Sequence, residues 1–396
     1  MVEMVQGGTR GAVRRAIVIG NGFAGAENQS IGLVRALGLS DRHSLYRVTR
    51  PRGGINRWLP WLPLSLHKKV DCVISGIRAR NKDSLGLSSG VVEADAKQIA
   101  NMARQAFAKD GLLLVVASGR DTIPIASAIK RLAPENVFLV QIQHPRSHLN
   151  RFDLVIAPHH DYYPLTPHAQ KQIPWFLRRW ITPCEPPGKN VVLTIGALHQ
   201  ADSAALRSAA SSWHAELAPL PKPLLVVNIG GPSGDRKSCI CICFVGNCSY
   251  GVDLAKQLAA MLQNVLWSCG SVRISFSRRT PEKVSKLLIR EFSNNPKVYI
   301  WDGEALADAF VITADSVSML SEACSTGKPV CVIGAECCTW KFADFQNRLE
   351  ERGVVRPFTG QEDMSMCWSY VPLNDTAEAT SQVNKVLAER GWSILA

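Results

Sequence analysis

The chain has 396 residues, of which 46% are hydrophobic and 20% are charged. This length predicts two domains, and this composition excludes a wholly disordered protein. The net charge of +12, from 45 basic and 33 acidic residues, suits an anionic partner such as a phosphate ligand, an acidic protein or an anionic membrane surface. The chain carries no zinc-finger spacing and no RNA-binding signature, so we expect no nucleic-acid partner.

The twelve cysteines do not form the framework of a secreted protein. Six of them are scattered, mostly in apolar or helical contexts, where free cysteine acts as a small hydrophobic side chain: Cys72, Cys184, Cys269, Cys324, Cys331 and Cys367. No signal peptide is recognisable, so we expect a reducing compartment. The longest apolar runs, such as 112–117 and 224–227, are much shorter than the ~18 residues of a membrane-spanning helix. Any action at a membrane is therefore expected at its surface.

The first half of the chain predicts a parallel, doubly wound sheet, because strands and helices alternate. Strands are predicted at 16–19, 44–48, 112–117, 137–142 and 153–157, and helices at 27–37, 93–109 and 124–132. Gly20, Gly22 and Gly25 match the dinucleotide motif G-x-G-x-x-G, but no acidic residue follows the second strand to hold a ribose. We therefore interpret these glycines as letting a loop approach a ligand or a neighbouring domain, and not as evidence for NAD.

Two polar or aromatic clusters in this half are candidate binding residues. Arg57, Trp58 and Trp61 lie in a stretch rich in tryptophan, proline and arginine, which is either a partner-docking surface or a packed surface turn. Four histidines follow strand ends: His144, His148, His159 and His160. Because no carboxylate and histidine pair lies at helical spacing, we interpret them as polar groups lining a cleft and expect no metal site.

The second half repeats the pattern after a proline-rich linker, 164–188, with a short helix predicted near 175–180. Strands are predicted at 191–195, 224–229, 272–276 and 298–301, and helices at 206–217, 252–265, 281–292, 339–352 and 377–390. Strand 224–229 ends at Gly230 and Gly231, a second glycine turn. Residues 235–248 contain four cysteines, Cys239, Cys241, Cys243 and Cys248, without C-x-x-C pairing, and the first three alternate as in an extended chain. This pattern predicts an irregular insert that binds no metal.

The stretch 310–334 predicts a strand, a turn, a helix and a second strand. Asp315, Ser316 and Ser318 are expected to supply capping oxygens where the helix begins, and Glu322 follows in that helix. Open α/β sheets bind ligands at the edge where these residues are placed, and a helix N-terminus there favours phosphate. The alternative is an ordinary capped helix in a β-α-β unit.

Several long stretches resemble the plant mitochondrial fission family known for elongated-mitochondria mutants. They are IVIGNGFAGAENQSIGLVRALGL, LYRVTRPRGG, QIQHPRSHLNRFDLVIAPHHDYYPLT, LTIGALH and TADSVSMLSEACSTGKPV. The resemblance implies an α/β fold with two Rossmann-like domains facing across a cleft, as in GT-B glycosyltransferases. We expect domains at 1–182 and 183–375, with the helix in 376–396 packing back on the first domain.

The resemblance also implies a function. It implies a peripheral protein on the cytosolic face of the mitochondrial outer membrane, present also in the cytosol, that recruits dynamin-related GTPases. The alternative is a glycosyltransferase that uses a nucleotide-diphospho-sugar.

Carried over from those transferases, a nucleotide-like pocket would comprise Ser316, Ser318 and Glu322, with Gly230 and Gly231 on the facing loop. Gly22 of the first glycine turn completes the predicted set. No catalytic base can be assigned, so the sequence favours a protein that is not an enzyme, with a nucleotide or nucleotide sugar as the only cofactor considered. The cysteine-rich insert and the short connection 303–308 depart from the family pattern beside this pocket.

Overall fold

The computed structural model describes residues 11–48, 92–145, 148–175, 178, 183, 185–232, 248, 250–301 and 307–395. The chain divides into two compact units. Unit 1 comprises Met1–Ala157, Pro187–Val192 and Ala377–Ala396, and unit 2 comprises Pro158–Pro186 and Leu193–Thr376. Residues 158–182, which the sequence assigned to the first domain, thus group with unit 2.

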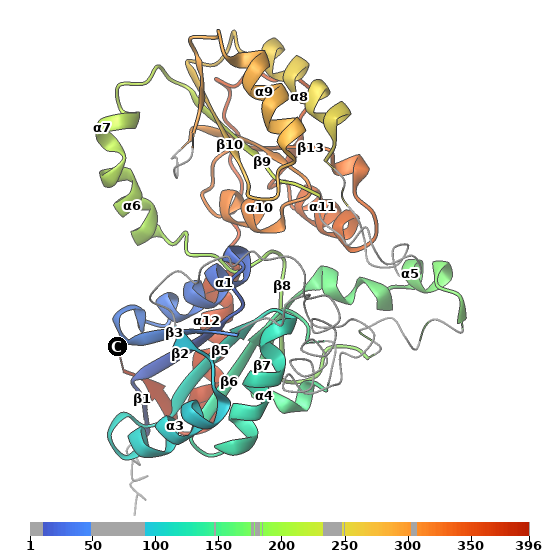
Figure 1. Cartoon of the computed structure of the whole chain (residues 1–396). Helices are drawn as coiled ribbons and strands as arrows, with labels where there is room; N and C mark the ends of the chain where they lie inside the picture. Colours follow the sequence, from blue (N-terminus) through green and yellow to red (C-terminus); the bar gives the residue numbers. More distant parts are fainter. Residues whose placement is uncertain are drawn as a thin grey trace, which may run out of the picture. The chain divides into compact units, whose positions relative to one another are not determined.

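Unit 1 is built on a parallel sheet of hydrophobic strands (Figure 1). Its order is β4 (Val92–Glu93), β3 (His43–Arg47), β2 (Arg15–Gly20), β5 (Leu113–Ser118), β6 (Val137–Ile142), β7 (Leu154–Pro158) and β8 (Val191–Thr194). The chain begins near the centre at β2, moves outward through β3 and β4, and returns to β5 on the other side of β2. This is the Rossmann strand order. Successive strands are added on one side of β2 up to β4 and on its other side from β5 onward, so the order of strand addition reverses between β2 and β5.

Helices accompany the strands of unit 1. They are α1 (Ala24–Ala36), η1 (Ser40–Arg42), α3 (Ala96–Asp110), η2 (Arg120–Thr122), α4 (Ile123–Leu132), η3 (Leu149–Arg151) and most of α12 (Asp375–Glu389). The C-terminal strand β15 (Trp392–Ile394) pairs in parallel with β1 (Gly11–Val13). After α12, Arg390 forms an ion pair with Asp153 at 2.5 Å and lies over the ring of Phe138. The C-terminal residues of the chain are therefore part of the same unit as its first strands.

Unit 2 repeats the same strand order. Its parallel sheet runs β11 (Val298–Ile300), β10 (Ser271–Phe276), β9 (Leu224–Ile229), β12 (Ala309–Thr313), β13 (Val330–Ile333) and β14 (Arg356–Pro357). Its helices are η4 (His159–Leu165), α5 (Pro167–Gln172), α6 (Ser203–Ser212), α7 (His214–Leu217), α8 (Val252–Val265), α9 (Glu282–Phe292), α10 (Val317–Cys324), η7 (Ala335–Cys337) and α11 (Lys341–Glu351). The order of strand addition in this sheet reverses between β9 and β12, which we call its reversal point.

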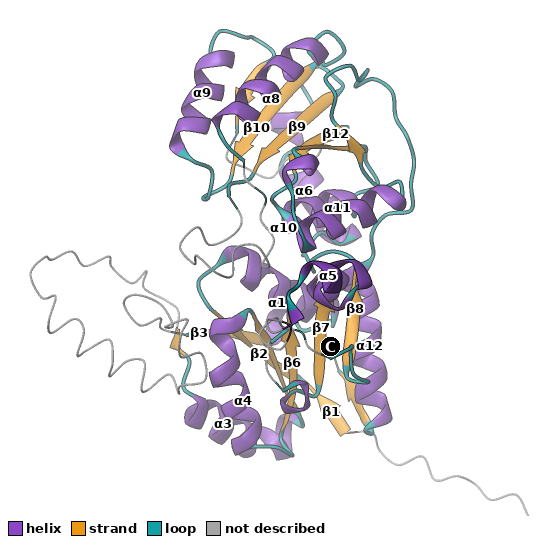
Figure 2. Ribbon diagram, turned by 90° about the vertical axis from the view of Figure 1, so that its right-hand side faces the viewer, coloured by secondary structure: helices purple, strands orange, loops and turns teal. Residues whose placement is uncertain are grey.

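Two hydrophobic clusters fill the faces of the unit 2 sheet. On one face, Val227 and Ile274 pack with residues of α8 and α9, which Figure 2 shows beside β9 and β10. On the other face, Ile312 packs with Leu320 of α10 and Phe345 of α11. Alternating strand residues thus point to opposite layers of helices, as expected for a sheet buried on both sides.

The predicted fold class, α/β with two Rossmann-like parallel sheets, is confirmed. The predicted cleft between the two halves stays a prediction. The helix predicted at 206–217 is two helices, α6 and α7, separated by Trp213. The insert residues 235–247, residues 303–306 of the short connection and most of the helix predicted near 175–180 lie outside the described residues. Across the part of the chain that is described, no helix is both long and apolar enough to cross a bilayer.

Candidate functional site

The residues predicted to form a nucleotide-like pocket in unit 2 lie at the reversal point of its sheet. Gly230 and Gly231 directly follow β9, and Asp315 follows β12 just before α10 begins at Val317. Strands β9 and β12 are parallel neighbours, so these residues emerge at the same edge. This is the position at which open α/β sheets bind ligands.

The backbone donors of this glycine turn are bonded to the chain's own side chains. The Gly231 N–H donates to Asp315 Oδ2 at 2.6 Å, and the Gly230 N–H donates to Thr313 Oγ1 at 2.8 Å. Asp315 is buried, with only 2% of its surface exposed. In phosphate-binding turns such N–H groups point at the ligand. Here the carboxylate of Asp315 and the hydroxyl of Thr313 accept these hydrogen bonds where a phosphate ligand would otherwise do so.

The two glycines are required by close packing inside unit 2. A Cβ atom at Gly230 would lie 2.3 Å from Asp315 Oδ2, and one at Gly231 would lie 2.0 Å from the Arg279 carbonyl oxygen. The Thr280 hydroxyl, next to Arg279, also donates to the carbonyl oxygens of Ile229 and Gly230. The glycines therefore let this turn approach Asp315 and the loop after β10, which explains their presence without a ligand.

Burial raises the pKa of Asp315 above its ordinary value. Hydrogen bonds from Thr313 and the Gly231 N–H, and the positive charge of Arg279, oppose this shift without cancelling it. At this edge of the sheet the Gly231 N–H is therefore already bonded to an acidic side chain. A phosphate brought to this turn would compete with that side chain for the Gly231 N–H and would be repelled by its charged form.

The other predicted pocket residues occupy α10 and its start. Ser316 is the N-cap residue of α10, but its side chain makes no capping hydrogen bond, so the predicted capping role of Ser316 is wrong. Ser318 is half-buried in the first turn, and Glu322 is exposed further along the helix. Asp315 bonds across to Gly231, a contact that its position in the sequence did not indicate. A nucleotide-binding role of Ser316, Ser318 and Glu322 stays a prediction.

The glycine turn of unit 1 is closed in the same manner. The Gly22 N–H donates to Glu27 Oε1 at 2.8 Å, and Gly22 has a φ of 79° that favours glycine. Arg47 binds both oxygens of Glu27, with Nε to Oε1 at 2.8 Å and Nη2 to Oε2 at 2.7 Å. A Cβ atom at Gly20 would lie 2.4 Å from Glu27 Oε1. The first glycine turn is therefore packed against a partly exposed ion pair from its own unit, in which Glu27 is the buried member.

The charge state of this ion pair is well defined. Burial tends to raise the pKa of Glu27, but the hydrogen bonds from Arg47 and Gly22 and the charge of Arg47 outweigh it and lower the pKa. The hydrogen bond to Glu27 in turn raises the pKa of Arg47. Arg47 lies opposite Gly20 at the end of β3, close to where a dinucleotide-binding domain carries its acidic ribose ligand. Arg47, a basic residue where a dinucleotide-binding domain has an acidic one, was therefore the signal in the sequence that this turn does not hold a ribose.

The four histidines predicted at strand ends all lie within the described residues. Among the described residues, no group of three or more histidine, cysteine or acidic side chains is placed to hold a metal ion. His160 is buried rather than lining a cleft, and its ring meets Phe345 of α11 edge-on at 5.3 Å between centroids. The interpretation of His160 as a cleft residue is therefore wrong. Arg57, Trp58 and Trp61 lie outside the described residues.

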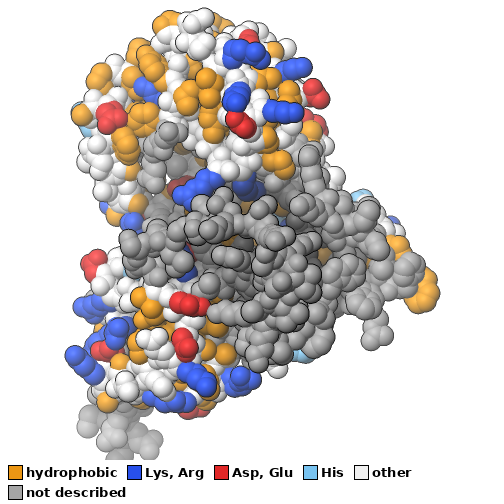
Figure 3. Space-filling view, viewed as in Figure 1, with side chains coloured by type: hydrophobic (Ala, Val, Ile, Leu, Met, Phe, Trp, Pro, Cys, Tyr) orange, Lys and Arg blue, Asp and Glu red, His pale blue; other side chains and the backbone are white. Residues whose placement is uncertain are grey.

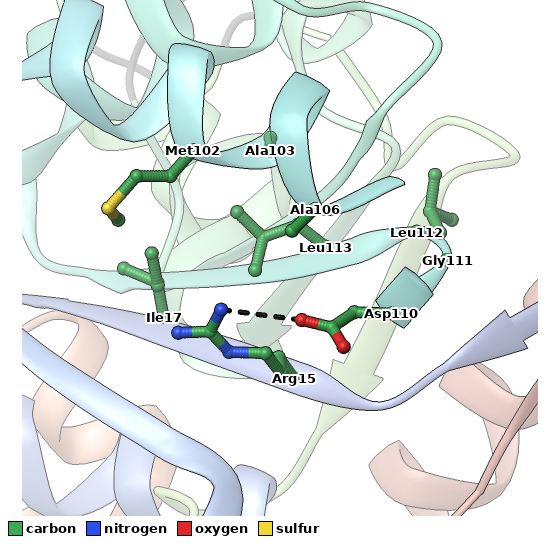
Figure 4. Close-up of a pocket in the computed structure, with 9 residues that line it drawn as sticks. All are labelled: Arg15, Ile17, Met102, Ala103, Ala106, Asp110, Gly111, Leu112 and Leu113. Atoms are coloured by element: carbon green, nitrogen blue, oxygen red, sulfur yellow. Dashed lines mark hydrogen bonds and ion pairs between the residues drawn. The ribbon is translucent and has the colours of Figure 1, made fainter. Parts of the chain in front are cut away.

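A small cavity lies near the starts of β2 and β5 in unit 1, away from the glycine turn at the end of β2 (Figure 4). Arg15 and Asp110, which line it, form an ion pair at 3.3 Å, and Met102 and Leu113 contribute apolar walls. Its volume of about 10 Å³ holds about one water molecule. This cavity is too small for a nucleotide or a sugar.

Comparison with known proteins assigns the family. A model of the family "Mitochondrial fission ELM1" matches residues 24–387. The mitochondrial fission protein ELM1 of Arabidopsis thaliana is 60% identical over 98% of this chain and 95% of its own length. The chain belongs to the mitochondrial fission ELM1 family. The resemblance stated from the sequence motifs is thereby confirmed.

More distant similarities extend beyond the ELM1 family. An uncharacterised protein of Rickettsia prowazekii is 28% identical over 69% of this chain and 79% of its own length. Among solved structures, UDP-N-acetylglucosamine 2-epimerase from Rickettsia bellii has a TM-score of 0.45 at 11% identity, covering 96% of this chain and 97% of its own. A complex of Staphylococcus aureus MnaA with UDP has the same TM-score at 14% identity and the same coverage. These scores carry no argument about ligand or activity.

Proposed function

We propose that this member of the ELM1 family acts in mitochondrial fission as a peripheral protein of the outer membrane. In this proposal it lies on the cytosolic face, exchanges with the cytosol, and brings a dynamin-related GTPase to division sites. The observation that carries the proposal is the 60% identity to the Arabidopsis fission protein over nearly the whole of both chains. Identity at this level, maintained over this length, supports a shared cellular role.

The distribution of charge supports a contact with an anionic surface. Residues 49–91 contain eight basic and two acidic residues, which gives this segment +6 of the chain's net +12. On the face shown in Figure 3, basic and acidic side chains of the described residues are interspersed. The basic surplus is thus concentrated in one segment of the sequence. Clustered Lys and Arg attract anionic lipids and acidic proteins through the same electrostatic term.

The same segment contains Arg57, Trp58 and Trp61, which we propose as anchors for the GTPase. Tryptophan and arginine are the residue types most enriched among the side chains that dominate binding energy at protein interfaces. Here they are adjacent to the concentrated positive charge, which would accelerate the encounter with an acidic partner. The proposal therefore assigns recruitment to 49–91 and not to the glycine turns.

The geometry of the two glycine turns supports a role without transferase chemistry. In each unit the N–H group that would face a diphosphate donates to a carboxylate of the chain itself, Glu27 or Asp315. A nucleotide sugar would have to displace a buried acid to gain that donor. This argues against the alternative of a glycosyltransferase and for a scaffold that retains the fold alone.

Deletion of the gene tests the cellular role. Loss of the protein is expected to leave long mitochondria and to reduce the amount of dynamin-related GTPase on them, measured by fluorescence microscopy and by fractionation. Mitochondria of normal length with normal GTPase recruitment would contradict the proposal.

A pull-down with the folded full-length protein tests the surface. Replacing Arg57, Trp58 and Trp61 by alanine is expected to abolish capture of the GTPase, whether or not UDP-N-acetylglucosamine is present. The matched control replaces Trp175 and Trp267, which are 80% and 70% exposed outside the basic segment, and should capture the GTPase normally. Unchanged capture by the first variant would refute the assignment of the surface. Capture that requires the nucleotide sugar would instead favour a ligand-dependent role.

A further inference from the structure

Two cysteines of unit 2 face each other across an isolated antiparallel bridge. Cys248 is the last cysteine of the cysteine-rich stretch, and Cys338 follows the 3-10 helix η7 that comes after β13. Cys248 and Cys338 are partners in this bridge, and both are buried, at 3% and 8% exposure. Both carry free thiols in the structure. Ninety residues of sequence separate them, so the fold, and not the sequence, brings them together.

Their sulfur atoms share the same surroundings. The Sγ atoms of Cys248 and Cys338 each lie within hydrogen-bond distance of the carbonyl oxygen of Gly334, at 3.9 Å and 3.8 Å, and also of each other. Facing residues of an antiparallel pair have Cα atoms about 4.5–5.5 Å apart. Disulfides join Cα atoms about 4.4–6.8 Å apart. The usual spacing of partners in an antiparallel bridge thus falls within the range that a disulfide spans.

We propose that Cys248 and Cys338 are a redox modification site that forms an intramolecular disulfide with a small-molecule disulfide such as glutathione disulfide. A Cys thiolate attacks the oxidant, one glutathione leaves, and the second Cys sulfur then displaces the other glutathione. The Sγ–Sγ bond forms, two protein thiols lose two protons and two electrons, and one glutathione disulfide is reduced to two glutathione molecules. In a reducing compartment such bonds are transient and report the redox state.

The position of the bond connects it with the reversal point of the sheet. Cys338 Sγ also lies 3.8 Å from the carbonyl oxygen of Ala314, the residue before Asp315. Oxidation removes the thiol hydrogens that these carbonyl oxygens accept. It also closes a loop from 248 to 338 that includes β10 to β13, which restricts the unfolded chain and should raise the melting temperature.

The chain provides an internal comparison for this site. Cys337 is exposed and adjacent to Cys338, and its thiol donates to Glu336 Oε1 at 3.9 Å. The hydrogen bond with Cys338 and burial both raise the pKa of Cys248, so its thiolate is scarce at neutral pH. Exchange at the buried pair should therefore be slower than glutathionylation of Cys337, while the disulfide, once formed, should be the more resistant to reduction.

The test is peptide mapping of the full-length protein after equilibration in glutathione redox buffers. Free thiols are blocked by alkylation, the protein is digested, and linked peptides are identified by mass spectrometry before and after reduction. The expected result is a linkage between the peptides of Cys248 and Cys338, with a mass loss of two hydrogens and a melting temperature that rises on oxidation and falls again with dithiothreitol.

The controls separate this linkage from others. A Cys337→Ser variant, and a variant with Cys239, Cys241 and Cys243 all changed to Ser, should retain the linkage, whereas Cys338→Ser should lose it and lose the rise in melting temperature. The linkage is read from the unaltered protein, so poor folding of a variant does not affect the main result. Pairing of Cys248 or Cys338 mainly with another cysteine would overturn the proposal. The absence of any 248–338 linkage while the exposed Cys367 becomes glutathionylated would also overturn it.

Discussion

His160 should make unit 2 lose stability as the pH falls. Its ring is 4% exposed, meets Phe345 of α11, and has a buried Nδ1 without a hydrogen-bond partner. Burial lowers the pKa of His160 from 6.5 to about 4. Asp161 opposes this shift, while the positive charges of Lys341 and Arg348 and the neighbouring His159 add to it. The neutral ring is thus the form that the fold accepts.

The sign and size of the effect follow from proton linkage. The folded pKa lies below the unfolded value, so between about pH 4 and pH 6.5 the unfolded chain binds more protons at this site. Stability is therefore fully present above pH 6.5 and is lost as the pH falls. At pH 5 the loss is about 2 kcal/mol, and the limit below both pKa values is about 3 kcal/mol.

The assay is urea denaturation followed by circular dichroism at about pH 7.5 and pH 5. Replacing His160 by glutamine should reduce the difference in unfolding free energy between the two pH values by about 2 kcal/mol, whatever the variant costs at either pH. The exposed His168 in α5, changed to glutamine, is the matched control and should leave that difference unchanged. If both variants retain the full pH dependence of the unmodified protein, the assignment to His160 is refuted.

Three further predictions concern the stability supplied by buried carboxylates, and a fourth concerns the binding of UDP. Asp375 accepts the N–H groups of Ile195 and Gly196 at 2.7 Å and 2.9 Å, so Asp375→Ala should lower the unfolding free energy by about 2–5 kcal/mol in urea denaturation, and a loss below 1 kcal/mol would contradict this. Glu27→Gln should lower the unfolding free energy by about 1–3 kcal/mol in the same assay. This is less than a fully buried ion pair would give, because the side chain of Arg47 is 38% exposed. An unchanged denaturation midpoint would contradict a stabilising role of the ion pair. Asp315→Asn keeps an acceptor for the Gly231 N–H and should change stability by less than about 1 kcal/mol. By calorimetry the unmodified protein should not bind UDP at millimolar concentration, and tight binding would show that Asp315 does not block the turn.

The fold could be predicted from the sequence because its strands are continuous hydrophobic runs. Segments such as β5, β6 and β9 are buried in a parallel sheet, and Val, Leu and Ile therefore make up most of their residues. The helices between them have amphipathic spacing, and the helix 206–217 was misjudged only because its apolar residues continue past the break at Trp213. Local patterns therefore determined element type, and the Rossmann order followed from their alternation.

The contacts of the candidate site could not be predicted in the same way. The motif of Gly20 and Gly22 indicated a close approach of the backbone, but not that Glu27 would be the group approached. Asp315 was assigned to capping because it precedes a helix, whereas its partner, Gly231, lies 84 residues earlier in the chain. Such contacts depend on the register between β9 and β12, which no local pattern specifies. The pairing of Cys248 with Cys338 was missed for the same reason.

In both units an N–H group of the glycine turn donates to a carboxylate of the chain, but the carboxylate comes from a different element in each. In unit 1 the carboxylate comes from the first turn of the helix after the glycines and is neutralised by Arg47. In unit 2 it comes from the turn after the neighbouring strand β12 and is held by Gly231 and Thr313. The N–H groups of Gly22 and Gly231 lie where a Rossmann domain binds phosphate, and each donates a hydrogen bond to one of these acids. A ligand could use them only if the acid moved. Because both halves carry such an acid, the absence of phosphate chemistry would be a property of the whole chain and would not depend on one altered loop. The basic, tryptophan-containing segment 49–91, which no glycine turn includes, is then the part of the sequence where a fission partner should be sought.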